Sequence, residues 1–524
     1  MLAMARLIVL ALAAALIAAP TACRKPPEGA ARVVVIGGDA GLVDPATGAI
    51  SGLSAVLLTN VAQGLVRFDA RGQIEPGLAE RWNVSDDGLS YIFRLAADEW
   101  HNGRRITAHQ VARILRRQLA AASANPLRDT LGAVDEIVAM TDRVLEIRLK
   151  APRPNLLQLL AQPELGLVYE GAGSGPFRIS ERPGASGEIR LERTIPLPDQ
   201  DDEQREEVLL SAANAAEAVR AFAERRSDLV IGGTVADLME ARQARLPRNS
   251  LRFDPVSGLF GLVPARRNGP LADPELRRLL SQAIDRDALI ASLAVPGLMP
   301  RATLLETGLH GIPDPAAPEW MATPLAERRE ALAAAADRLF DNVERPVLRI
   351  ALPDGAGGQI LLDRLAEDWG ALGIRVERSE RGVPTDLRLI DRVAPSTSPA
   401  WFLRQFRCDV VPICDPEIDD LLAAARAAPV TAQRAALLLD ASRRMDELQL
   451  FLPITRSRVS TRIRTDSGSR PKAMFRRRPV DSREIIRLSL ASNAGRGRSA
   501  DGRRNDWRQS RGFGRTPATS GSAR

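Results

Sequence analysis

The chain of 524 residues is poor in the residue types that usually build metal and nucleophile sites. It has three histidines (His101, His109 and His310), three cysteines and two tyrosines. Because imidazole and thiolate are the main ligands of zinc and nickel, we expect no metal bound directly by side chains and no other cofactor. The sequence also lacks Gly-x-Ser-x-Gly, His-Glu-x-x-His and a phosphate-binding loop, so it does not predict an enzyme.

Long apolar runs are missing as well, apart from one near the first residue. Arg6 is followed by apolar residues from Leu7 to Ala19, which is short of the roughly 20 residues of a membrane-spanning helix. This run predicts a secretory signal peptide at residues 1–22. The following Thr-Ala-Cys resembles a lipoprotein signal, in which Cys23 would be acylated and would anchor the protein to a membrane. Pro20 departs from that pattern, and a plain secretory signal with an incidental cysteine is the alternative.

The other two cysteines lie close together in the chain. Cys408 and Cys414 are separated by Asp-Val-Val-Pro-Ile. In the oxidising compartment that a signal peptide implies, such a pair most simply forms a disulfide that closes a short loop. A metal pair is the alternative, but no histidine lies near it in the sequence.

The formal net charge of +7 does not predict nucleic-acid binding, because the charge is concentrated in one segment. Residues 493–524 contain eight arginines against Asp501 and Asp506, a balance of +6. This segment is rich in glycine, serine and arginine and has almost nothing apolar to bury, so we expect a disordered basic tail at 491–524. A solvated tail is the simplest interpretation, and contact with anionic lipid or peptidoglycan is the alternative.

Local patterns predict mixed helices and strands. Asp87-Gly88 lies between two alternating runs and predicts a hairpin, while Thr107 and Gln110 form a capping box that begins a helix. A strand at 347–352, a helix at 359–372 and a strand at 374–377 predict parallel pairing. Since a single core stops growing at roughly 250 to 300 residues, a chain of this length implies more than one lobe.

Several short phrases occur in a fixed order along the chain. They are Asn60–Asp69, Gly72–Trp82, Ser85–Leu95, Trp100–Ala108, Thr141–Pro152, Gly173–Phe177 and Asp273–Arg286. Together these phrases resemble the periplasmic solute-binding proteins of ABC importers, in the large family that captures peptides, nickel complexes and related solutes. The resemblance extends from about residue 32 to about residue 460.

The resemblance implies an α/β fold of the periplasmic-binding-protein type, class II or cluster C. This fold has two main lobes with a cleft between them and an extra subdomain. The expected segments are a signal peptide (1–22), lobe I (23–59, 166–256 and 453–490), the extra subdomain or lobe II (60–165), lobe III (257–452) and the basic tail (491–524).

The resemblance also places the ligand-contacting segment at residues 386–403. Peptide binders of this family have an aspartate there for the ligand's ammonium group, and that position falls at Pro395 in this sequence. Asp391 would serve if the loop shifted register, and Arg392 would pair with a ligand carboxylate; the alternative is that both are ordinary surface or interlobe ions. Trp401 either covers the ligand or belongs to the core. Phe260, in the crossing segment 251–264, is a further candidate contact.

These observations lead to one functional hypothesis and one alternative. We expect a lipid-anchored, monomeric solute-binding protein of the periplasm that captures a peptide-like or other small organic solute. It would deliver this solute to an ABC permease in the inner membrane. The alternative is an envelope lipoprotein of the same fold that acts as a ligand sensor or scaffold without transport.

Overall fold

The computed structural model describes residues 29–38, 41–48, 50–69, 72–181, 187–196, 203–380, 382–455 and 458–464. The expected signal peptide, Cys23 and the basic tail lie outside these residues. Within the described part of the chain, no helix combines the length and the apolar character needed to cross a membrane.

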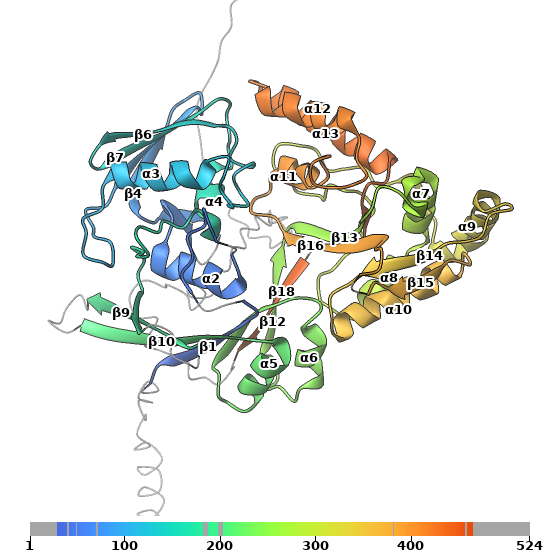
Figure 1. Ribbon diagram of the computed structural model, residues 1–524, viewed down its shortest axis with the longest axis horizontal. Helices are drawn as coiled ribbons and strands as arrows, with labels where there is room; N and C mark the ends of the chain where they lie inside the picture. Colours follow the sequence, from blue (N-terminus) through green and yellow to red (C-terminus); the bar gives the residue numbers. More distant parts are fainter. Residues whose placement is uncertain are drawn as a thin grey trace, which may run out of the picture. The chain divides into compact units, whose positions relative to one another are not determined.

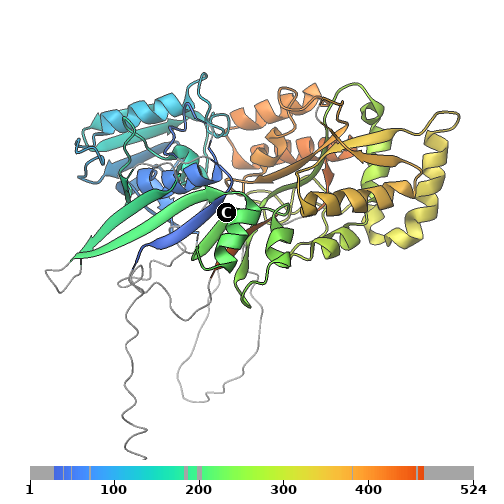
Figure 2. The same cartoon turned by 60° about the horizontal axis from the view of Figure 1, so that its bottom comes forward.

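A seven-stranded sheet contains the first and the last described strands (Figure 1). Its order is β12 (Leu251–Val256), β18 (Arg458–Arg464), β11 (Leu229–Gly233), β1 (Ala31–Ile36), β10 (Glu203–Ala213), β9 (Ile189–Pro196) and β8 (Arg178–Glu181). The apolar run Val33–Ile36 belongs to β1, which is parallel to both β10 and β11. Figure 2 shows β9 and β10 as a long antiparallel pair, in green.

Both faces of this sheet are covered by helices. Val33 and Val35 point to one face and share a core with α2 (Gly52–Leu57). Val34 points to the other face, as the two-residue period of a strand requires, and packs with residues of α5 (Ala215–Ala223) and α6 (Leu238–Gln243).

A four-stranded antiparallel sheet follows in the order β4 (Ala79–Val84), β5 (Ser90–Leu95), β7 (Val144–Leu149) and β6 (Val134–Thr141). The predicted hairpin is confirmed: Gly88 joins β4 to β5 with φ 67°, a value that favours glycine. The predicted capping box is confirmed too, since Thr107 and Gln110 cap α3 (Ala108–Leu119), which lies over this sheet (Figure 1).

Shorter elements join this sheet to the rest of the chain. A two-stranded sheet of β2 (Val66–Phe68) and β3 (Ile74–Pro76) precedes it, and α4 (Leu156–Leu160) and the 3-10 helix η2 (Pro163–Leu165) follow it. The chain then passes over the π-helix η1 (Leu58–Ala62) so closely that a Cβ on Gly173 or Gly175 would overlap the backbone of Asn60 and Val61. The Gly-Ser-Gly phrase is therefore required by a close approach of two backbones.

A five-stranded sheet has the order β15 (Arg375–Arg378), β14 (Val347–Ala351), β16 (Leu387–Val393), β13 (Gly258–Pro264) and β17 (Leu452–Pro453). The predicted parallel pair is confirmed, because β14 and β15 are parallel and α10 (Ala356–Gly370) joins them. Three further helices accompany this sheet, namely α7 (Pro274–Ala283), α8 (Arg286–Leu293) and α9 (Leu325–Leu339). Their core includes the fully buried Trp369, whose indole N–H donates a hydrogen bond to the carbonyl oxygen of Leu280 at 3.0 Å.

A separate apolar core lies under three helices on the opposite face of this sheet, because Leu259 and Val263 of β13 belong to it while Phe260 and Leu262 belong to the core that contains Trp369. These helices are α11 (Pro399–Arg404), α12 (Pro416–Ala427) and α13 (Thr431–Glu447). Phe402, Phe406 and Phe451 are fully buried among them. The sulfur atoms of Cys408 and Cys414 are joined in the structure, with their Cα atoms 5.1 Å apart.

Candidate ligand-binding site

The segment between β16 and α11, residues 394–398, is buried, and two distant parts of the chain hold it. The side-chain amide of Asn155 donates a hydrogen bond to Oγ of Ser396 at 2.9 Å. The side-chain amide of Gln162 donates another to the carbonyl oxygen of Pro395 at 2.6 Å. Residues next to and after α4 are thereby fixed to the loop that follows β16.

The other contacts come from residues 257 and 310. The backbone N–H of His310 donates to the carbonyl oxygen of Thr397 at 3.0 Å, and the N–H of Ala394 donates to the carbonyl oxygen of Ser257 at 2.9 Å. The loop that carries His310 is held in turn by α13, because the N–H of Leu304 donates to a carboxylate oxygen of Asp446 at 2.8 Å. These bonds satisfy part of the polar backbone of this buried loop, as its burial demands.

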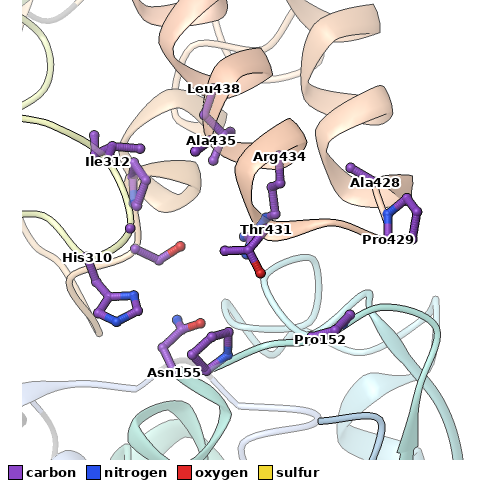
Figure 3. Close-up of a pocket in the computed structure, with 14 residues that line it drawn as sticks. Pro152, Asn155, His310, Ile312, Ala428, Pro429, Thr431, Arg434, Ala435 and Leu438 are labelled. Atoms are coloured by element: carbon purple, nitrogen blue, oxygen red, sulfur yellow. The ribbon is translucent and has the colours of Figure 1, made fainter. Parts of the chain in front are cut away.

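A hollow that is open to solvent lies beside this segment, and we call it the histidine hollow. The space within it, with the open solvent at its mouth included, is about 540 Å³. Its wall combines apolar side chains with a few polar ones, a mixture typical of small-molecule sites. Figure 3 shows Pro152 and Asn155 on one part of the wall and Thr431 and Arg434 of α13 facing them. The remaining lining residues are Pro154, His310, Gly311, Ile312, Ser398, Pro399, Ala428, Pro429, Ala435 and Leu438.

A second hollow, also open to solvent, adjoins the first, and we call it the arginine hollow. The space within it, with the open solvent included, is about 480 Å³. The two share Asn155, Ser398, Arg434 and Leu438 in their walls. The arginine hollow is further lined by Thr130, Ala133, Arg153, Leu159, Ala400, Arg404, Leu422, Ala425 and Arg426. Its wall thus contains four guanidinium groups, at positions 153, 404, 426 and 434.

The positive charges that line the arginine hollow repel one another. Burial lowers the pKa of Arg404 to about 9, and the positive charges of Arg426, Arg434, Arg153 and Arg407 act in the same direction. Burial likewise lowers the pKa of Arg153 to about 10, with Arg434 and Arg426 adding to the effect. Both groups stay protonated at neutral pH, so the wall is strongly positive.

The structure places the four predicted ligand contacts on and near β16, outside the walls of both hollows. Phe260 and Asp391 are cross-strand partners in the β13–β16 pair, and Phe260 is only 2% exposed. Arg392 is exposed and donates to the side-chain oxygen of Gln405 at 2.7 Å. Trp401 is 7% exposed and packs edge-on against Phe402 in the core beneath α11.

Other residues of the site were not singled out from the sequence. Asn155, Gln162 and the four hollow-lining arginines carry no local pattern that marks them. The sequence marks His310 only as one of three histidines, too few to predict a metal site. Among the described residues, no group of three or more histidine, cysteine, aspartate or glutamate side chains is arranged to hold a metal ion.

Comparison with known proteins identifies the family. The model of the bacterial extracellular solute-binding proteins, family 5, matches residues 73–386, more than half of the chain. The chain belongs to this family, and the resemblance found in its sequence phrases is confirmed.

Individual relatives match to different extents. The probable deoxycholate-binding periplasmic protein YgiS of Escherichia coli is 30% identical over 145 residues, which cover 24% of this chain and 27% of the relative. The chain therefore spans only about a quarter of that relative's length. The probable di/tripeptide-binding protein 5 of Pseudomonas aeruginosa is 26% identical over 465 residues, which cover 74% of this chain and 83% of the relative.

A solved structure confirms the predicted fold class. OppA of Haemophilus influenzae, in complex with RPPGFSPFR, has a TM-score of 0.69 and 18% identity, covering 85% of this chain and 98% of that protein. At this identity the likeness establishes the fold alone, which is the α/β periplasmic-binding-protein fold.

Proposed function

We propose that the protein captures a peptide-like or other small organic solute outside the cytoplasm and delivers it to an ABC importer permease. The observation that carries this proposal is the buried 394–398 segment, where Asn155 and Gln162 meet the loop after β16 beside the histidine hollow. In a family of solute-binding proteins, a contact between two distant chain segments beside a hollow suits a ligand site whose two sides close on a solute.

The names of the relatives support a broad solute class rather than one compound. One relative is named for deoxycholate, another for di- and tripeptides, and the OppA structure contains a nonapeptide. We propose that this protein does not hold an unmodified peptide by an aspartate at the aligned position, because that position is Pro395 and its carbonyl oxygen already accepts from Gln162. A solute whose polar groups do not include a terminal ammonium group fits the wall of the histidine hollow better.

The proposal includes the cellular setting. A signal peptide at residues 1–22 would export the chain, and acylated Cys23 would anchor a monomer to the membrane in the periplasm, near the permease. Binding energy would come from buried apolar area and a few directed polar groups, with no chemical turnover.

The test is native mass spectrometry of the full chain purified from the envelope fraction under gentle conditions. Compounds released on unfolding are identified and added back to the emptied protein during thermal melting. A ligand that binds only the folded state raises the melting temperature in proportion to the logarithm of its concentration above Kd. We expect at least one retained organic solute that does so.

Three outcomes separate the alternatives. A retained solute that stabilises the protein, together with its uptake by cells that depends on this chain, supports transport. Stabilisation without any effect on uptake favours the sensor alternative. No retained compound, and no shift with peptides, bile acids or metal chelates, contradicts solute binding itself.

A further inference from the structure

The arginine hollow concentrates positive charge without matching negative charge. Arg153 precedes α4, Arg404 ends α11, Arg426 is near the end of α12, and Arg434 is in the first half of α13. Four arginines from four separate segments of the chain thus line one hollow. Such convergence is unfavourable in an empty protein, because like charges repel and because burial also removes much of the hydration of Arg153, which is 8% exposed.

The carboxylates nearby are engaged elsewhere. Among the residues that the structure describes, no carboxylate oxygen lies within 4.0 Å of the guanidinium nitrogens of these four arginines. Asp129 pairs instead with Arg128 at 3.2 Å and approaches Arg407 at 4.0 Å. Asp409 pairs with Arg407, although the charge of Arg426 also contributes to lowering its pKa.

Backbone carbonyl groups satisfy only part of this cluster. Arg404 donates from Nε to the carbonyl oxygen of Ala400 at 3.1 Å and from Nη1 to that of Asp129 at 2.8 Å. Arg153 donates to the carbonyl oxygens of Pro152 at 2.8 Å and Arg426 at 3.0 Å. These bonds fix the two guanidinium groups in place without neutralising them.

The guanidinium groups of the other two arginines can donate hydrogen bonds to a bound anion. Within the described part of the chain, the guanidinium groups of Arg426 and Arg434 have no hydrogen bond to another protein group. Arg434 lines both hollows, and Figure 3 shows it on α13 facing the segment that carries Asn155. An anion here would meet two fixed and two adaptable planar donors, the arrangement that binds carboxylate or phosphate bidentately.

We propose that the arginine hollow is an anion subsite that binds a carboxylate or phosphate group of the solute whose remainder occupies the histidine hollow. This inference rests on the proposed solute-binding function and narrows it, because it makes the solute an anion. A free inorganic anion shares the same chemistry and would occupy the same subsite.

The first experiment uses inorganic phosphate and citrate as probes on the full chain at constant ionic strength. Calorimetric titration and thermal melting should both show saturable binding to the wild-type protein. Arg426→Gln and Arg434→Gln should each weaken it by about tenfold or more, the usual effect of losing one charge-assisted hydrogen bond. Both side chains lack internal hydrogen bonds, so these variants should fold, which circular dichroism verifies.

The matched control is Arg443→Gln. Arg443 lies on the same helix, α13, but pairs with Asp440 on the surface and does not line either hollow. The Arg443→Gln substitution removes the same positive charge as the other two, so a general effect of net charge on anion binding would appear in this variant as well. We expect its affinity for both probes to equal that of the wild type.

The outcomes show whether the anion subsite exists and whether the anion that it binds is part of the solute. Absent saturation, or equal losses in the Arg434→Gln and Arg443→Gln variants, would overturn the anion subsite. If the retained solute displaces phosphate, the subsite belongs to the solute; if both bind together, the anion is a separate ion and the inference about the solute is wrong. Retained solute without any phosphate or citrate binding leaves the proposed function intact and rejects only the subsite.

Discussion

The stability of the fold near the candidate ligand-binding site should depend on pH through the carboxyl group of Asp446. It accepts a hydrogen bond from the backbone N–H of Leu304, at the base of the loop that carries His310. Burial raises the pKa of Asp446 to about 7, against partial opposition from this hydrogen bond and from the charge of Arg301. Arg301 has a second carboxylate, that of Glu306, at 3.9 Å.

The direction of the pH effect follows from the proton balance. An aspartate in the unfolded chain has a pKa of about 3.9, so between about pH 4 and pH 7 the folded state binds more protons at Asp446 than the unfolded state. The contribution of this group is therefore fully present below about pH 4 and is lost as the pH rises through about 7. The difference between a pKa of about 7 in the folded state and about 3.9 in the unfolded state corresponds to about 4 kcal/mol at most, and partial solvent access reduces the expected loss of stability to about 2–4 kcal/mol.

The substitution Asp446→Asn removes this titration and keeps the acceptor for Leu304. Urea unfolding at pH 4.5, 6 and 8 should give a free energy of unfolding that falls less steeply with pH in the variant than in the wild type. Asp440→Asn, on the same helix but half exposed, is the control and should follow the wild-type curve. Parallel curves for Asp446→Asn and the wild type would refute the reasoning.

Three further substitutions test individual parts of the fold by urea unfolding. Gly173→Ala should destabilise by about 3 kcal/mol, because its Cβ would overlap the backbone of η1, whereas Gly41→Ala, with open space around it, should be neutral within about 1 kcal/mol. Trp369→Ala should lower the free energy of unfolding by about 3–5 kcal/mol, since it empties the core and frees the carbonyl of Leu280. Thr107→Ala should cost about 1 kcal/mol through loss of the cap of α3, and a loss below about 0.3 kcal/mol would contradict the capping role.

The elements that the sequence predicted well are those specified by local chemistry. The Asp87-Gly88 hairpin and the Thr107 cap depend on side chains within a few residues of the backbone that they organise. The parallel β14–α10–β15 unit follows from a strand, helix and strand in succession, although α10 begins and ends two or three residues earlier than predicted.

The strands that the sequence did not predict have local residue patterns atypical of strands, and tertiary contacts override these patterns. The first half of β10 is charged, with Glu203, Arg205, Glu206 and Glu207, and does not read as a strand. It pairs nevertheless with β9, where Arg190 and Arg193 form ion pairs with Glu207 and Glu206 across the two strands. Cross-strand charge pairing of this kind becomes visible only once the partner strand is known.

The site was harder to predict for a related reason. Asn155 and Ser396 are 241 residues apart in the chain, and Gln162 and Pro395 are 233 apart. The family resemblance drew attention to the loop after β16, but it could not indicate which residues of the preceding segments meet that loop. The arginine hollow is built in the same way, from four segments of the chain with no common motif.

The most direct test of the central claim is a crystal structure of the protein with the solute that it retains on purification. We predict that the solute contacts the buried 394–398 segment and lies in the histidine hollow, within reach of Asn155 and His310. Its anionic group should lie against Arg434. A solute bound away from the 394–398 segment, with both hollows filled only by water, would contradict the account.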